Sequence, residues 1–253
     1  GSEMCIRDRN SAGLPSERYS TDVNFSFNAQ HHFPSFCLII LPTKPGNSSG
    51  ISLEVPLYLS IHICMILFDG CSWTFGAGVD PQYRFTDLIG GINIGECGKS
   101  NDGILRTTIN YLERNDNIET VIIQWTVNLR TEFRKPDAPA YNFIGRGAVD
   151  RATGHRKKIA SEYYKNIYNS NHALDNFYKN QFLMETYLKS KNLRYYMMTI
   201  DEEPEGCGSV WGSSYPYNIR KLVGQHTLRE GGGHPNKRGH QLISDHIRAS
   251  ISV

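Results

Sequence analysis

Four segments of the chain carry residues of the kinds that nucleophilic acyl transfer needs. Ser72 lies in Gly70-Cys-Ser72, and Gly98, Asn128 and His234-Pro235 follow in that order. Acyl transfer to a serine requires a hydroxyl, a base that deprotonates it, and N–H donors for the developing oxyanion. Because the sequence offers a candidate for each of these groups, we expect the four segments to meet in one site.

The element that must present Ser72 is a strand that ends in a tight turn. The run Met65–Phe68 is apolar and stops at Gly70, which predicts a buried strand. Parallel α/β sheets bind ligands just beyond the carboxyl ends of such strands. The alternative is that Ser72 only caps a short helix, a position that serine favours. The histidine near the other end of the chain favours the catalytic interpretation.

From Met65 onward, apolar runs alternate with helical patterns. Strands are predicted at 65–70, 92–94, 119–126 and 193–200, and helices at 81–89, from 101, at 156–190 in two pieces, and after His234. Alternation without a repeat predicts a three-layer α/β/α sandwich with a mostly parallel, flavodoxin-like sheet. No fifth strand is recognised. Residues 130–156 are polar and are predicted to form a lid or another long excursion. Leu174, Tyr178 and Phe182 are expected to share one buried helix face.

The composition limits the classes of partner. The 253 residues are 39% hydrophobic and 21% charged with a net charge of +2, which suits a globular domain and gives no reason to expect nucleic acid or membrane-surface binding. The six cysteines form no CxxC pair, which disfavours a zinc site or a disulfide framework and suits a reducing compartment. No signal peptide or spanning segment is recognised. We therefore expect a cytoplasmic protein without metal, cofactor or stable membrane insertion.

The first 64 residues differ from the rest. They contain stretches rich in Ser, Asn and Pro and show no sustained period. Ser2–Arg9 resembles translated sequencing-adapter read-through of the kind found in metagenomic gene predictions. Met65 opens the first convincing strand and is a natural start position. Residues 1–64 are therefore predicted to be a non-native or dispensable extension and residues 65–253 the folded domain, so that a chain beginning at Met65 should fold.

The order Ser, Gly, Asn, His along a βα chain resembles the four blocks of the SGNH (GDSL-type) hydrolase family, over about Met65 to Val253. The resemblance implies that Ser72 is the nucleophile and also donates its backbone N–H to the oxyanion. It implies a second backbone N–H from Gly98 and a side-chain N–H from Asn128. His234 would be the general base and then the general acid.

Three positions depart from the family pattern. The first block reads GCS, with Cys71 in place of the usual Asp, a variant associated with divergent phage or marine-bacterial members. The third block reads Thr126-Val-Asn-Leu, so a slip of two residues makes Thr126 the donor instead of Asn128. Gly231 stands where an Asp normally orients the histidine. A backbone carbonyl, Glu230 or the acidic turn 201–203 could replace that Asp, or the site could be inactive.

Several other residues have non-catalytic interpretations. Cys71 is predicted to be a small buried filler, because no basic residue is adjacent in sequence. His240 could form a metal pair with His234, but a capping or packing role is favoured because no other ligand accompanies the pair. Arg130 and Glu132 could touch substrate, although solvated surface charges are the favoured interpretation. The tyrosines between 163 and 178 are assigned to packing.

The family resemblance implies a serine ester hydrolase that works through an acyl-enzyme intermediate. The implied substrate is a small ester or acylated carbohydrate, such as an O-acetyl group on a sugar, with lipid or lysophospholipid esters second. An inactive module of the same fold that binds glycan or protein is the alternative. A flavodoxin-like nucleotide binder is disfavoured, because the loop after the first strand lacks GxGxxG and GxxxxGKS spacing.

Overall fold

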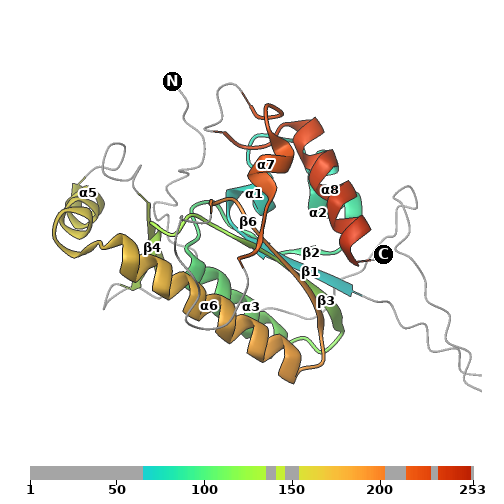
Figure 1. The fold of residues 1–253 in the computed structure, drawn as a ribbon, viewed down its shortest axis with the longest axis horizontal. Coiled ribbons are helices and arrows are strands. Elements are labelled where there is room, and N and C mark those ends of the chain that lie inside the picture. Colours follow the sequence, from blue (N-terminus) through green and yellow to red (C-terminus); the bar gives the residue numbers. More distant parts are fainter. Residues whose placement is uncertain (1–64, 135–140, 146–153, 203–214, 229–232, 252–253) are drawn as a thin grey trace, which may run out of the picture.

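The computed structural model describes residues 65–134, 141–145, 154–202, 215–228 and 233–251. Its centre is a five-stranded sheet in which every neighbouring pair is parallel. The strands are β1 (Met65–Gly70), β2 (Ile92–Asn93), β3 (Ile118–Trp125), β6 (Arg194–Thr199) and β7 (Tyr217–Asn218), in the spatial order β2-β1-β3-β6-β7 (Figure 1). This is the flavodoxin-like order 2-1-3-4-5, and it confirms the predicted fold class.

Helices cover both faces of the sheet and make the three layers. One layer holds α3 (Asn101–Leu112) and α6 (Ser170–Ser190), and the other holds α2 (Phe85–Ile89), α7 (Ile219–Val223) and α8 (Lys237–Ile251) (Figure 1). Successive strand residues point to opposite faces. Leu67 therefore packs in the core beneath α3 and α6, whereas Phe68 packs in the core beneath α7 and α8. Both side chains are fully buried, as expected for a parallel sheet covered twice.

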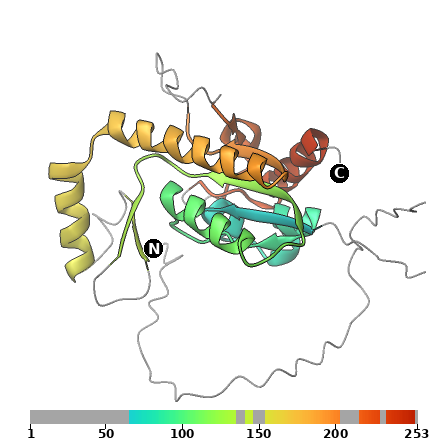
Figure 2. The ribbon, with the colours of Figure 1, turned by 90° about the horizontal axis from the view of Figure 1, so that it is seen from below.

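The polar excursion predicted at 130–156 contains regular structure that the sequence did not reveal. Within its described part, β4 (Thr131–Arg134) and β5 (Tyr141–Ile144) pair as an antiparallel hairpin. The helix α5 (Gly154–Glu162) begins at its end and continues through the π-helical turn η2 (Tyr163–Ile167). Figures 1 and 2 both show the hairpin and α5 at one end of the domain, beyond the sheet. Its remaining residues, 135–140 and 146–153, lie outside the described part of the chain.

Most predicted elements are confirmed, with three corrections. The helix predicted at 81–89 is divided into a 3-10 turn, η1 (Pro81–Tyr83), and α2. The fifth strand, β7, is present. On α6, Leu174 and Tyr178 are buried, but the side chain of Phe182 is 37% exposed, so it does not belong to the buried face.

The predicted extension 1–64 lies outside the described residues, so its dispensability stays a prediction. In the described part of the chain, no helix has the length and apolar character needed to cross a bilayer.

Candidate active site

Ser72 and His234 are in direct contact although 162 positions separate them: Ser72 Oγ lies 2.8 Å from His234 Nε2. Ser72 is the first residue of the short helix α1 (Ser72–Phe75), which follows β1, and His234 lies just before α8. Cys71, not Ser72, occupies the N-cap position, so the capping alternative for Ser72 is wrong. Ser72 is buried and His234 is half-buried. A hydroxyl and an imidazole at this distance form the pair that nucleophile activation requires.

The turn that presents Ser72 is held by Gln124 on the neighbouring strand β3. The side-chain oxygen of Gln124 accepts hydrogen bonds from the Cys71 backbone N–H at 3.2 Å and the Thr74 hydroxyl at 3.1 Å. Gly70 allows this approach, because an added Cβ would lie only 2.8 Å from the Gln124 carbonyl oxygen. The small residues before Ser72 are therefore required by the close packing of β1 against β3.

A short antiparallel contact and a helix cap position His234. Its backbone carbonyl accepts a hydrogen bond from the N–H of Leu228 at 2.8 Å. The side chain of Asn236 accepts from the N–H of Gly239 at 3.0 Å and so caps α8. Pro235 directly precedes that cap and lies outside the first turn of α8.

Gly98 lies in the loop between β2 and α3, which docks against the Ser72 turn. The N–H of Glu96 donates to the carbonyl of Gly70 at 3.1 Å, two residues before Ser72. Gly98 has a φ of +83°, a conformation that side chains rarely adopt, and an added Cβ would meet no atom within 4 Å. The loop therefore leaves open space at Gly98, as a second N–H donor to a substrate would require.

A buried ion pair that we did not predict joins the two segments that carry Ser72 and Gly98. Asp69 lies at the end of β1 and Lys99 follows Gly98, and their side chains are 0% and 1% exposed. Lys99 Nζ donates to Asp69 Oδ1 at 2.7 Å and to the Ile94 carbonyl at 2.8 Å. Further hydrogen bonds reach the Asp69 carboxylate from the Gly70 N–H and the hydroxyls of Thr107 and Thr108. Burial raises the pKa of Asp69, and Lys99 and the two threonine hydroxyls oppose that rise.

The third predicted donor, Asn128, lies beyond β3, where Asn101 and Asp201 hold it. Its side-chain oxygen accepts from Asn101 Nδ2 at 3.4 Å, and its backbone N–H donates to Asp201 Oδ2 at 3.0 Å. Asn101 also bonds both backbone groups of Thr126, the alternative donor. No contact within the described residues joins Asn128 or Thr126 to Ser72, so the choice between them stays a prediction.

The sequence did not identify the group that orients His234. Asp201, one candidate, accepts hydrogen bonds from the backbone N–H groups of Asn128 and Glu202, at 3.0 and 3.2 Å. Its carboxylate therefore positions the Asn128 segment. Glu203, Glu230 and Gly231 lie outside the described residues, and the suggestion that Glu230 or a backbone carbonyl orients the imidazole stays a prediction.

Of the two charged residues after Asn128, Glu132 is not the solvated surface charge that we expected. The side chain of Glu132 is 8% exposed and accepts two hydrogen bonds from Arg106, at 3.0 and 2.9 Å. Arg130 is half-buried. Burial alone would raise the pKa of Cys71, but the charge of Arg130 and nearby hydrogen bonds outweigh it and hold that pKa below its ordinary value. Cys71 is buried as predicted, but a cation does lie near it in space.

His240 has the packing role that we favoured. It is fully buried on α8, its ring stacks on Phe85 with centroids 5.8 Å apart, and its Nδ1 accepts from the Phe85 backbone N–H at 3.3 Å. Among the residues that the structure describes, no three His, Cys, Asp or Glu side chains are grouped to hold a metal.

The burial of His240 predicts a loss of stability in acid. Burial, together with Arg84 and His234, lowers the pKa of His240 from 6.5 to about 4. Between these two pH values the unfolded chain binds a proton that the folded chain does not. Stability should therefore fall by about 3 kcal/mol as the pH drops from 6.5 to 4. His240→Gln, which keeps an acceptor but does not titrate, should lose less in urea unfolding across this window; an equal loss would contradict the assignment.

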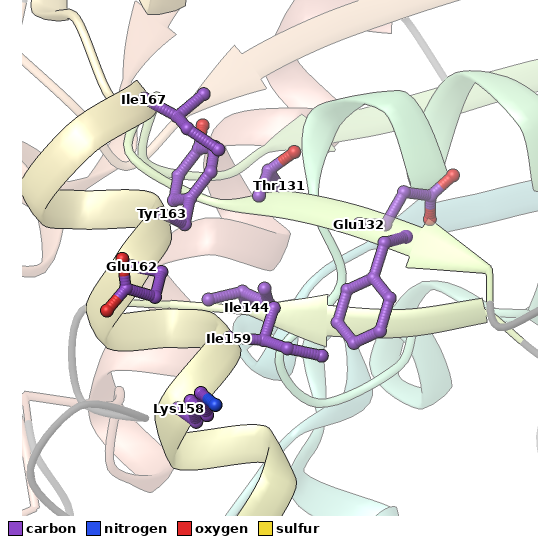
Figure 3. A pocket seen from close by; sticks show the side chains of 9 residues that line it. Thr131, Glu132, Ile144, Lys158, Ile159, Glu162, Tyr163 and Ile167 are labelled. Carbon is purple, nitrogen blue, oxygen red and sulfur yellow. The ribbon is translucent and has the colours of Figure 1, made fainter.

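An apolar cavity of about 470 Å³ lies away from these residues, between the β4–β5 hairpin and the α5–η2 helix. Ile144, Ile159, Tyr163 and Ile167 contribute to its wall, as Figure 3 shows. None of Ser72, Gly98, Asn128 and His234 lines it. Thr131 lines the cavity and directly follows Arg130 in the chain. The cavity therefore adjoins the segment that carries Asn128.

No family model and no curated protein matches the sequence. Similar solved structures include TesA (TM-score 0.45, 11% identity, covering 74% of this chain and 97% of that one). The psychrotrophic esterase EstA from Pseudoalteromonas sp. has a TM-score of 0.44 and 16% identity, with 74% of this chain and 96% of that one covered. A GDSL-like lipase from Bacteroides thetaiotaomicron has a TM-score of 0.42 and 17% identity, with 74% of this chain and 87% of that one covered. All three solved structures have TM-scores below 0.5 and share 17% identity or less with this chain.

Proposed function

We propose that this protein is a serine ester hydrolase in which Ser72 is the nucleophile and His234 the base. The observation that carries the proposal is the 2.8 Å contact between Ser72 Oγ and His234 Nε2. The contact lies beyond the carboxyl end of β1, which is where sheets of this order bind ligands. A serine placed there only for structure does not need an imidazole partner from the other end of the domain.

In the first half of the reaction, Ser72 Oγ attacks the ester carbonyl carbon and its proton passes to His234 Nε2. The carbonyl oxygen becomes an oxyanion, which the backbone N–H groups of Ser72 and Gly98 and the side-chain amide of Asn128 stabilise. The bond to the alcohol oxygen then breaks, and His234 gives its proton to the leaving alcohol. The acyl group remains on Ser72.

In the second half, water attacks the acyl carbon and transfers a proton to His234. The bond to Ser72 Oγ breaks, the carboxylic acid leaves, and His234 returns the proton to the serine. No metal or cofactor is needed in this sequence of steps. The neutral imidazole accepts a proton in each half-reaction and donates it in the collapse that follows.

The proposed substrate is a small acyl group, such as acetyl, on a carbohydrate or another alcohol. A lipid ester is the second candidate, which the apolar cavity beside β4 favours because it offers room for an aliphatic chain. Hydrolysis rates for p-nitrophenyl esters of increasing chain length separate the two. A decline beyond acetyl or butyryl favours the small-acyl substrate, and a maximum at long chains favours the lipid.

The test of the enzymatic function is covalent labelling with a fluorophosphonate probe, together with hydrolysis of p-nitrophenyl acetate. The wild-type chain should be labelled and should turn over the ester, and Ser72→Ala should do neither. Ser190→Ala, which alters an exposed serine at the end of α6, is the matched control and should behave as the wild type. Equal labelling and turnover by Ser72→Ala would refute the proposal, and a folded, unlabelled wild type would favour the inactive binding module instead.

A further inference from the structure

The side chain of Arg130 lies between the two segments that carry the proposed oxyanion donors. Its Nη1 reaches the carbonyl oxygen of Lys99 at 3.5 Å, and Lys99 is bonded to Gly98 in the chain. Its charge also acts on the Cys71 thiol, whose Sγ is 3.9 Å from Ser72 Oγ. The guanidinium therefore borders the space where an ester bound to Ser72 would lie.

Two cations near Arg130 are paired with carboxylates, and Arg130 differs from both. Lys99 pairs with Asp69 at 2.7 Å, and Arg106 pairs with Glu132 at 2.9 Å. Within the described ranges, Arg130 forms no ion pair with a carboxylate. A half-buried cation without a counter-charge is partly desolvated, and an anion supplied by a ligand would offset part of that cost.

The local structure holds the Arg130 side chain in place, and the described residues accept from only one of its N–H donors. The backbone N–H of Arg130 donates to the Val127 carbonyl at 3.2 Å, in the turn that contains Asn128. Gly145, after β5, lies beside the aliphatic part of the side chain. A guanidinium carries five N–H donors, and the bond that Arg130 makes within the described residues, at 3.5 Å, is long for an N–H···O contact. A guanidinium with donors to spare can bind a carboxylate through two hydrogen bonds.

We propose that Arg130 is an anion-binding subsite of the Ser72 site and selects esters that carry a carboxylate a few atoms from the scissile carbonyl. This inference rests on the proposed hydrolase function and narrows its substrate class. The carboxylate can belong to the alcohol part, as in an acetylated acidic sugar, or to the acyl part, as in a half-ester of a dicarboxylic acid. Both sources present the same chemistry to the guanidinium.

An anion-binding subsite and an oxyanion donor differ in which esters they act on. An oxyanion donor acts on every ester, because the charge forms on the carbonyl oxygen of each one. A subsite acts only on esters that carry the extra anion. The ratio of kcat/KM for a charged ester to that for its neutral analogue therefore isolates the subsite.

Two matched substrate pairs test the inference and distinguish the two sources. 4-Acetoxybenzoate against its methyl ester places the charge on the alcohol side, and monomethyl succinate against dimethyl succinate places it on the acyl side. In at least one pair the wild type should prefer the charged ester by about 10- to 100-fold in kcat/KM, the range for a hydrogen-bonded charge. Arg130→Gln should lower kcat/KM for the charged ester more than for its neutral partner and so remove the preference, and Arg130→Lys should retain part of it. Because the charges attract through solvent, added salt should reduce the preference.

Binding to the inactive Ser72→Ala chain supplies a readout that does not depend on turnover. Calorimetric titration should show tighter binding of the charged ester than of its neutral partner, and adding Arg130→Gln should abolish the difference. Two results would overturn the inference: no preference in either pair, or an equal loss on charged and neutral esters in Arg130→Gln. If no ester is turned over but the charged one still binds through Arg130, the hydrolase proposal fails and the subsite stands.

Discussion

Replacing His234 with alanine should lower kcat for p-nitrophenyl acetate by about 10⁴- to 10⁶-fold, the range found when a serine hydrolase loses its base. The 2.8 Å contact to Ser72 Oγ is the physical reason, since without the imidazole no described group accepts the serine proton at that distance. The folded structure should change little, because the imidazole is half-buried at the surface end of the turn before α8.

The matched control for this change is His172→Ala, which removes an exposed histidine at the start of α6 and should leave kcat unchanged. Millimolar imidazole added to His234→Ala should restore part of the rate, because a small base can enter the space that the side chain left. A variant that kept at least a tenth of the wild-type kcat would exclude His234 as the base.

Replacing Lys99 with methionine should cost about 3–5 kcal/mol in the free energy of unfolding, the usual cost of leaving a buried charge without its partner. Asp69 would keep its hydrogen bonds from the Gly70 N–H and the threonine hydroxyls but would lose the only described cation beside it. Urea unfolding followed by circular dichroism measures this loss. A change below about 1 kcal/mol would contradict the buried pair.

The same variant should lower kcat more than it changes KM, because the side chain of Lys99 ties the loop that carries Gly98 to Asp69 and to the Ile94 carbonyl. The double variant Asp69→Asn/Lys99→Met removes both charges and should recover most of the lost stability, since neutral replacements of buried pairs are often well tolerated. Its kcat should stay low if the pair positions the Gly98 loop. Full recovery of both quantities would show that the pair serves stability alone.

A stability-matched control separates positioning from general destabilisation. Leu188 is fully buried near the end of α6. It is close in sequence to the start of β6, so it lies near the amino-terminal ends of the strands, whereas Ser72 lies beyond a carboxyl end. Leu188→Ala should cost about 2–5 kcal/mol through the cavity it leaves. Below its unfolding transition it should keep wild-type kcat, in contrast to Lys99→Met.

Apolar residues made four strands of the central sheet predictable, whereas β7 and the β4–β5 hairpin were missed. The apolar centre of β3 predicted a strand covered on both faces, and β3 is almost fully buried. The equally short β2 was predicted because isoleucines lie on both sides of Asn93, whereas Tyr217 and Asn218 of β7 form no apolar run. The hairpin β4–β5 was missed because its strands of four residues lie in a polar, proline-containing segment, and pairing between strands is a tertiary property.

The residues of the site also divide into those that the sequence predicted and those that it did not. Ser72 and His234 were predicted because the order Ser, Gly, Asn, His along a βα chain is a specific signal, and the structure brings the two residues together. The Asp69–Lys99 pair was missed, because lysine is almost never fully buried and thirty positions separate the two residues. An aspartate next to Gly70 at the end of an apolar strand was the available signal. The position of Arg130 depends on how the turn after β3 folds back on the Gly98 loop, which sequence spacing does not encode.

The contact between the first strand's turn and the last helix has a consequence for folding. Ser72 and His234 come from opposite ends of the described domain, so the site forms only when α8 has docked on the sheet. Contacts of such large sequence separation form late, since the loop that they close is long. During synthesis, Ser72 leaves the ribosome long before its base exists. Under the proposed function, the return of ester hydrolysis in a refolding experiment should report the last step of folding, and a chain trapped without its docked C-terminal helix should keep Ser72 but hydrolyse no ester.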